Sequence, residues 1–146
     1  MQVFLVGTPY ETAVALDYRR RNKQIIECNQ ILKAIENPGA AWFNHPVVKM
    51  YTYSTDFLRH YKATLELYRS GQLAEAMKES EIAMSYKPAF YCDRLINQMK
   101  RRLYTKDNEF YSKWSEFGET EVNLYYVDNQ WIAYKNGKKV PLEEAY

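Results

Sequence analysis

Cysteine, glycine and histidine are scarce in this sequence, and each shortage argues against a class of site. The 146 residues include two cysteines, five glycines and two histidines. Cys28 and Cys92 lack the CxxC spacing of redox and zinc sites, so we expect both to be reduced thiols in the core. His45 and His60 are not at ligand spacing. We therefore expect no metal and no cofactor.

Long apolar runs and a strong excess of one charge are also missing. No run of 18 apolar residues occurs and no charged-then-apolar leader begins the chain, so we expect a soluble cytoplasmic protein without a membrane partner. The net charge of +2 is too small to identify an anionic partner. Its distribution is more informative, because basic residues cluster at 19–23 and again at 100–106.

The remaining composition is that of one folded domain. Hydrophobic residues make up 47% of the chain and charged residues 26%, which is typical of globular proteins. A chain of 146 residues is long enough to bury a single core without disulfides.

The start of a first helix is marked by Thr8, Pro9 and Glu11, which form a capping box with proline at the first helical position. We predict that this helix runs to residue 36, because Pro38 disfavours helical backbone in the residue before it. Arg21 interrupts the predicted core stripe, whose members are Val14, Tyr18, Ile25, Cys28, Leu32 and Ile35.

Further helices are predicted over 44–71, 72–86 and 89–106, with more helical chain after a break at 107. The composition changes after residue 118. Aromatic and β-branched segments at 121–127, 130–134 and 138–142 are joined by Asp128-Asn129 and Asn136-Gly137, a pattern typical of tight hairpins. The fold class is therefore predicted as mainly α. We expect a compact bundle of four to five helices, residues 1–118, and a small C-terminal antiparallel β-hairpin or meander, residues 119–146, packed on the same domain.

The basic turn at 19–23 is the first candidate for function. Consecutive arginines on a helix point in three directions, and Arg20 falls in a half-buried row between Asp17 and Gln24. A buried guanidinium needs a partner, and either Asp17 or Glu27 can supply one. A guanidinium held in this way is suited to phosphate. The alternative is an ordinary solvated helix face.

The second candidate is the stretch Asn44-His45-Pro46. His45 can act as an acid, a base or a donor to phosphate. Alternatively, Asn44 or His45 caps the helix that Pro46 begins.

The third candidate would imply a different class of function. Tyr68, Gly71, Ala76, Ala83 and Pro88 match the second half of a tetratricopeptide repeat. One copy is present, whereas such repeats need about three to bury a continuous core. A tight helical hairpin explains the same residues, and a protein-interaction module remains an alternative.

Three segments carry a resemblance to a known family. The segments LDYRRRNKQIIECNQIL, WFNHPVVKM and YTKDNEFYSKW, the last followed by NLYYV, have the order and spacing found in viral and bacterial proteins grouped with the pyrimidine-dimer DNA glycosylases. The resemblance covers roughly residues 1–127, and the hairpin after residue 129 looks like an addition. The matching positions are Leu16, Asp17, Arg20, Lys23, Gln24, Glu27, Gln30 and Asn44-His45-Pro46.

The resemblance implies a specific chemistry. Enzymes of this family attack the sugar C1′ of a damaged nucleotide with the α-amine of the chain terminus, form a Schiff base and cut the strand by β-elimination. A carboxylate on the first helix stabilises the cationic sugar. The implied partner is double-stranded DNA with a damaged or modified base, bound by a monomer or by a dimer, in the host cytoplasm if the protein is viral.

Two departures from the family affect the catalytic residues. Gln2 is bulky, so Met1 should be retained and its α-amine would be the nucleophile. A gapless alignment places Arg20 where the family has its catalytic glutamate. The nearest carboxylates are Asp17 and Glu27, and Asp17 is preferred because it is closer to the start of the helix.

The sequence thus predicts a DNA-binding protein of the glycosylase fold. It would be either a DNA glycosylase and abasic-site lyase or an inactive member that binds modified nucleic acid or a nucleotide. The predicted catalytic residues are Met1, Asp17 and Glu27. The predicted DNA contacts are Arg19, Arg20, Lys23, Gln24, Asn44, His45, Lys100, Arg101, Arg102, Phe110, Tyr111 and Trp114.

Overall fold

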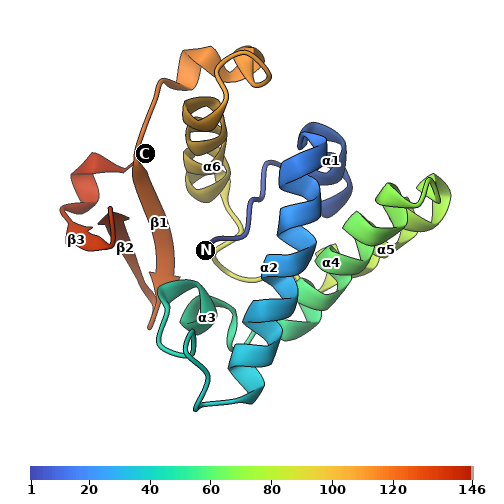
Figure 1. Cartoon of the computed structure of the whole chain (residues 1–146), viewed down its shortest axis with the longest axis horizontal. Helices are drawn as coiled ribbons and strands as arrows, with labels where there is room; N and C mark the ends of the chain where they lie inside the picture. Colours follow the sequence, from blue (N-terminus) through green and yellow to red (C-terminus); the bar gives the residue numbers. More distant parts are fainter. Residues whose placement is uncertain (146) are drawn as a thin grey trace. The chain divides into compact units, whose positions relative to one another are not determined.

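The computed structural model describes residues 1–145, which form six α-helices, two 3-10 helices and a three-stranded antiparallel sheet (Figure 1). The prediction of a mainly α protein with a C-terminal β-meander is confirmed. The chain divides into two compact units, residues 1–89 and residues from 90 onward. The domain boundary expected at residue 118 lies within the second unit and stays a prediction.

The first unit is helical and starts with an extended segment, residues 1–6. Its helices are α1 (Pro9–Ala15), α2 (Tyr18–Glu36), α3 (Pro46–Tyr51), α4 (Thr55–Arg69) and α5 (Leu73–Ser85). Helices α4 and α5 form a hairpin, and α4 also packs against α1 and α2 (Figure 1). The N-terminal segment contributes Val3, Phe4, Leu5 and Val6 to the core of this unit, all nearly inaccessible to solvent.

A break at residues 16–17 separates α1 from α2, so the predicted single helix over 9–36 is wrong. Leu16 is extended (φ −71°, ψ 141°), and Asp17 caps α2 by accepting a hydrogen bond from the backbone N–H of Arg20 at 3.3 Å. Arg21 spans the break. Its Nε atom donates to the carbonyl oxygen of Ala13 and its Nη2 atom to that of Leu16, both at 2.9 Å. An aspartate that caps one helix ends the preceding one, since the cap residue has non-helical backbone.

The break also changes which residues are buried. Ile25 and Cys28 lie in the core as predicted, and Leu32 and Ile35 are half-buried. The predictions for the two residues nearest the break are wrong, because Val14 and Tyr18 are exposed. A periodicity counted across two separate helices does not keep its phase.

The helix predicted over 44–71 is likewise interrupted, between α3 and α4. The Thr52 hydroxyl donates to the carbonyl oxygen of Val48 at 2.9 Å, and the N–H of Ser54 turns back to the carbonyl oxygen of Tyr51 at 2.9 Å. Short hydroxyl side chains that bond the backbone compete with helix continuation.

The second unit combines one α-helix with the meander. It comprises α6 (Asp93–Lys106), the 3-10 helix η1 (Ser112–Phe117), β1 (Val122–Val127), β2 (Gln130–Lys135), β3 (Lys138–Val140) and the 3-10 helix η2 (Leu142–Glu144). The strands pair in sequence order. Both predicted hairpin turns are present, with φ of 52° and 62° at Asp128-Asn129 and 52° and 76° at Asn136-Gly137. Positive φ at both central residues is what a type I′ turn requires.

Candidate active site

The amide of Gln24 fixes the N-terminal segment against α2. Its Oε1 atom accepts a hydrogen bond from the N–H of Phe4 at 2.9 Å, and its Nε2 atom donates to the carbonyl oxygen of Gln2 at 3.0 Å. The side chain of Gln24 thus pairs with this backbone as a neighbouring strand would. Because Gln24 is buried, the position of residues 2–4 is set by a hydrogen-bonded group in the core.

Tyr61 of α4 supports the same arrangement. Its hydroxyl donates to the carbonyl oxygen of Phe4 at 2.6 Å and lies 3.1 Å from Oε1 of Gln24. Burial raises the pKa of Tyr61 well above its usual value, so the phenol keeps its proton and remains a donor.

Glu27 places a carboxylate beside the first residues of the chain. Its Oε2 atom accepts from Nε2 of Gln24 at 3.1 Å and, at the longer distance of 3.5 Å, from the backbone N–H of Gln2. Lys23 lies at 3.9 Å from Oε1. Met1 is a single Cα–Cα step, about 3.8 Å, from Gln2. Glu27 is therefore the carboxylate that the fold brings to the chain terminus.

His45 belongs to the same region. Its Nδ1 atom accepts a hydrogen bond from the N–H of Val47 at 3.1 Å, so the predicted capping of α3 by His45 is present. The pKa of His45 is lowered by burial and by the positive charge of the N-terminal amine. The ring is thus neutral near pH 7, and because Nδ1 is an acceptor, the proton is assigned to Nε2. Glu27 lies beside Gln2, and His45 is close enough to the N-terminal amine to be affected by its charge, so both side chains lie near the start of the chain.

Asp17 lies at the start of α2, away from Glu27. It was preferred because it is closer to the helix start, and that reason does not hold in the structure. It pairs with Nη1 of Arg20 at 3.1 Å while capping α2. Glu27 follows ten residues later in the sequence, which is about 15 Å along a helix axis. The chain begins beside the middle of α2 and approaches the start of α2 only through α1 (Figure 1). Closeness to the helix start therefore does not mean closeness to the terminus.

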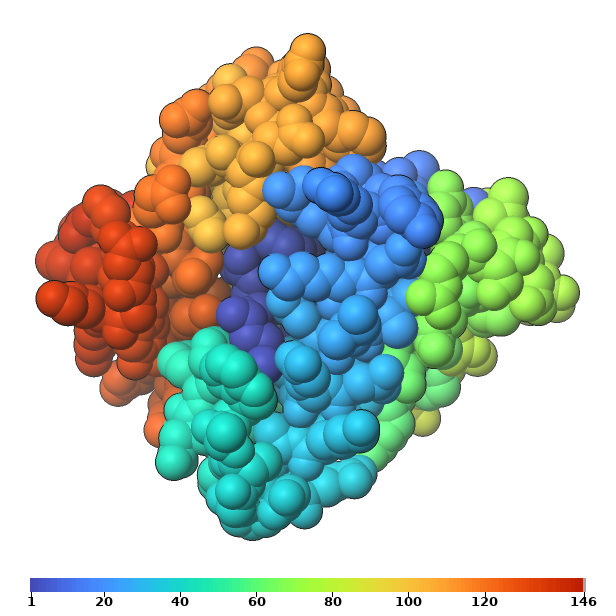
Figure 2. All heavy atoms as spheres, viewed as in Figure 1, coloured from blue at the N-terminus to red at the C-terminus, as the bar shows by residue number. Residues whose placement is uncertain are grey.

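Basic residues follow the outer face of α2, as predicted for Arg19 and Lys23. The exposed positions recur at spacings of four and three, and they are Arg19, Lys23, Ile26, Gln30 and Lys33. We call this set the α2 basic face. Figure 2 shows α2 in blue beside residues 40–52 in cyan, with the dark-blue N-terminal segment visible between them. Arg20, half-buried and paired with Asp17, lies next to this face.

The second basic cluster is largely engaged within its own unit. Arg102 is buried, and its Nε and Nη1 atoms donate to Oδ1 of Asn123 at 2.9 Å and to the carbonyl oxygen of Thr120 at 3.0 Å. Nζ of Lys100 lies over the rings of Trp114 and Phe117, at 5.8 and 5.4 Å from their centroids. Arg102 therefore has a structural role in its own unit, and its contact with DNA stays a prediction that its burial does not favour.

The predicted aromatic grip is also mostly internal. Tyr111 is fully buried and stacks on the nearly buried Trp114, with ring centroids 5.4 Å apart. Phe110 is 53% exposed. Of these three aromatic residues, Phe110 alone presents a large exposed surface, and the DNA contacts of Tyr111 and Trp114 stay predictions that their burial does not favour.

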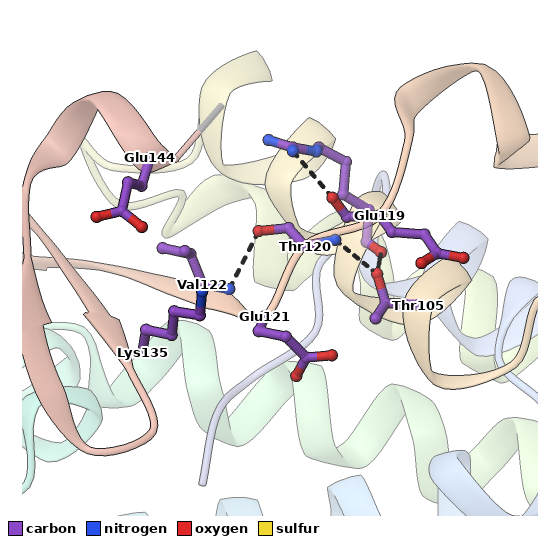
Figure 3. A pocket seen from close by; sticks show the side chains of 8 residues that line it. Thr105, Glu119, Thr120, Glu121, Val122, Lys135 and Glu144 are labelled. Atoms are coloured by element: carbon purple, nitrogen blue, oxygen red, sulfur yellow. Dashed lines mark hydrogen bonds between the residues drawn. The ribbon is translucent and has the colours of Figure 1, made fainter.

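Arg101 lines a pocket of about 380 Å³ in the second unit (Figure 3). Its guanidinium donates to Oε1 of Gln98 at 3.3 Å and to the carbonyl oxygen of Glu119 at 3.2 Å. The pocket is lined by Arg101, Thr105, Glu119, Thr120, Glu121, Val122, Lys135 and Glu144. Three carboxylates and two cations, Arg101 and Lys135, line the pocket, so the lining gives no excess of positive charge for a phosphate.

Residues 1–145 contain no group of three or more His, Cys, Asp or Glu side chains placed to hold a metal ion. Over the same range, none of the helices has the length and apolar character needed to cross a bilayer. Burial raises the pKa of the Cys28 thiol far above its usual range, so this cysteine is a poor nucleophile.

Comparison with known proteins identifies one family. Residues 1–66 match the family model described as pyrimidine dimer DNA glycosylase. The match covers less than half of the chain and includes Met1, α2 with Glu27, and His45. The resemblance is thus confirmed over residues 1–66, and its expected extension to about residue 127 stays a prediction. No curated protein and no solved structure matches the chain.

Proposed function

We propose that this protein binds damaged DNA and attacks the sugar C1′ of one nucleotide with the α-amine of Met1, using Glu27 as the catalytic carboxylate. The observation that carries the proposal is the position of Glu27, whose Oε2 atom lies 3.5 Å from the backbone nitrogen of Gln2. The match to the glycosylase family over residues 1–66 supports the same chemistry.

The proposed reaction proceeds in three steps: displacement of the base, opening of the sugar ring and elimination of the 3′ phosphate. The neutral amine of Met1 adds to C1′ while the glycosidic bond breaks, and the base leaves with that electron pair and takes up a proton. The added nitrogen gives up one proton and then expels the ring oxygen O4′, which takes up a proton, so that the ring opens and a protonated Schiff base forms. Removal of a proton from C2′ then expels the 3′ phosphate and cuts the strand.

Glu27 suits two roles in this sequence. Its negative charge stabilises the sugar as positive charge develops at C1′, and it can accept the proton that the amine loses on addition. Its side chain is 13% exposed, so water screens the interaction less than at an open surface.

His45 suits the role of a neutral hydrogen-bond donor. Nδ1 accepts from the N–H of Val47, so the ring proton is assigned to Nε2, the atom that would donate to an oxygen of the sugar or of a phosphate. Because its pKa is lowered, His45 does not add a second positive charge beside the amine near pH 7.

Phosphate contacts are assigned to the α2 basic face. Arg19, Lys23 and Lys33 are exposed on one side of the helix, and Arg20 is held by Asp17 at its edge. From residue 19 to residue 33 this face is about 21 Å long, enough to follow several phosphates of one strand.

Borohydride trapping on abasic-site DNA tests the proposal with two matched variants. Glu27→Gln should slow formation of the covalent adduct by about a hundredfold or more, because a general base and a charge are lost. Asp17→Asn removes a carboxylate from the same helix but keeps a good N-cap, so its rate should stay near that of the native protein. Intact mass should show that Met1 is present on the trapped chain.

The opposite pattern would reject the assignment of Glu27. If Asp17→Asn abolishes trapping and Glu27→Gln does not, the catalytic carboxylate is Asp17. If the native protein binds DNA but never traps, the inactive member of the fold that binds modified nucleic acid is the better function.

The α4–α5 hairpin is a single copy of unequal helices among the described residues, which does not favour a tetratricopeptide module.

A further inference from the structure

A tryptophan is held at the surface by the turns that precede α3. The N–H of Ala40 donates to the carbonyl oxygen of Asn37 at 2.9 Å, the N–H of Phe43 to that of Ala40 at 3.1 Å, and the N–H of His45 to that of Trp42 at 2.9 Å. Successive turns of this kind fix the backbone on both sides of Trp42. The residue itself is 49% exposed. A large apolar ring is therefore presented to solvent from a backbone segment held by its own turn hydrogen bonds.

The ring lies next to the candidate active site. Trp42 meets His45 edge to face, with ring centroids 5.9 Å apart and planes at 67°. His45 in turn is close enough to the N-terminal amine to be affected by its charge. His45 therefore contacts Trp42 directly and interacts electrostatically with the proposed nucleophile.

The chemistry around this ring favours a nucleobase. Cations of the α2 basic face belong to the same unit and attract the phosphate backbone, and the amine must reach a C1′ atom, to which a base is directly bonded. Bases stack on exposed aromatic rings with little dependence on sequence. Enzymes that act at the glycosidic bond also need the nucleotide unstacked from the duplex.

We propose that Trp42 is a stacking platform for an unpaired nucleobase displaced at the candidate active site. This inference rests on the proposed function. The base on Trp42 would belong either to the nucleotide whose sugar approaches Met1 or to a neighbouring nucleotide. It adds a ligand preference: strands with unpaired bases should bind better than the same backbone without bases.

Two single-stranded oligomers of equal length test the platform. One is oligothymidylate, and the other carries tetrahydrofuran abasic units throughout, so both offer the same phosphates. The native protein should bind oligothymidylate roughly tenfold more tightly. Trp42→Ala should remove this preference and leave abasic binding unchanged, whereas Trp42→Phe should keep most of it. Tyr53→Ala is the matched control, since Tyr53 is a 98% exposed aromatic residue of the same unit.

Tryptophan emission gives an independent readout. Oligothymidylate should quench the native protein, the abasic oligomer should not, and Trp42→Phe should lose the quenching. If the native protein binds both oligomers equally, or if Trp42→Ala keeps the preference, the platform is wrong while phosphate binding stands. If neither oligomer binds at low salt, the platform is wrong, and borohydride trapping on abasic-site DNA decides the proposed function separately.

Discussion

At the scale of single residues, Gln24 fixes the position of the first residues of the chain. Its amide contacts the backbone of Phe4 and Gln2 and the carboxylate of Glu27. A glutamine on an otherwise basic helix gives no sequence signal for this role. The role can be seen only in the folded chain, where the N-terminal segment lies beside α2.

Gln24→Ala should destabilise the protein by about 2–4 kcal/mol, because it leaves several buried donors and acceptors unpaired. Urea unfolding measures the change. Gln30→Ala is the matched control, since Gln30 is an exposed glutamine on the same helix and its loss should cost under about 0.5 kcal/mol. Equal effects of the two substitutions would show that the buried amide does not hold the segment.

The catalytic assignment shows what the sequence could and could not predict about the site. Glu27 was a catalytic candidate and His45 a candidate DNA contact, whereas Gln24 was also predicted to contact DNA but is buried against the N-terminal segment. The choice between Asp17 and Glu27 depended on the path of residues 1–8, which no local pattern determines. That path follows from the hydrogen bonds of Gln24 and from the burial of Val3, Phe4 and Leu5.

At the scale of elements, the junction of α1 and α2 depends on Arg21. The helix start at Thr8-Pro9-Glu11 and the turns at Asp128-Asn129 and Asn136-Gly137 were predicted, because each is encoded within four residues. The break at 16–17 was not. It is stabilised by a guanidinium that reaches back eight residues to Ala13, and hydrophobic periodicity does not report such a contact.

Arg21→Met should cost about 1.5–3 kcal/mol, because two carbonyl oxygens at the end of α1 lose a charged donor. Amide hydrogen exchange in residues 9–15 should accelerate more than exchange in α4. Arg19→Met makes the same chemical change at an exposed position and should leave stability and exchange near their native values. Unchanged exchange in α1 of Arg21→Met would contradict a bridging role.

At the scale of the whole molecule, the two basic clusters have different environments. The α2 basic face is open, whereas Arg102 is buried and Arg101 lies among carboxylates. Charge counted along the sequence treats the clusters as equal. Burial and pairing distinguish them, and both depend on the folded chain.

The salt dependence of DNA binding should therefore reflect the first cluster. With about three phosphates neutralised by Arg19, Lys23 and Lys33, the slope of log K against log salt should be near −3. Arg19→Ala and Lys23→Ala should each reduce the steepness by about 1. Lys100→Ala should leave the slope unchanged. A slope that responds to Lys100 and not to Lys23 would transfer the phosphate contacts to the second unit.

The hydrogen bonds of the N-terminal segment also set an order of events during synthesis. The hydrogen bond between Phe4 and Tyr61 can form only after 57 further residues have been made, and the one between Gln2 and Glu27 only after 25. Residues 2 and 4 are therefore fixed in place only after later parts of their unit have been made. A nascent chain shorter than about sixty residues carries the amine without the support of α4. The proposed nucleophile thus becomes part of an active site only after most of the first unit has been made.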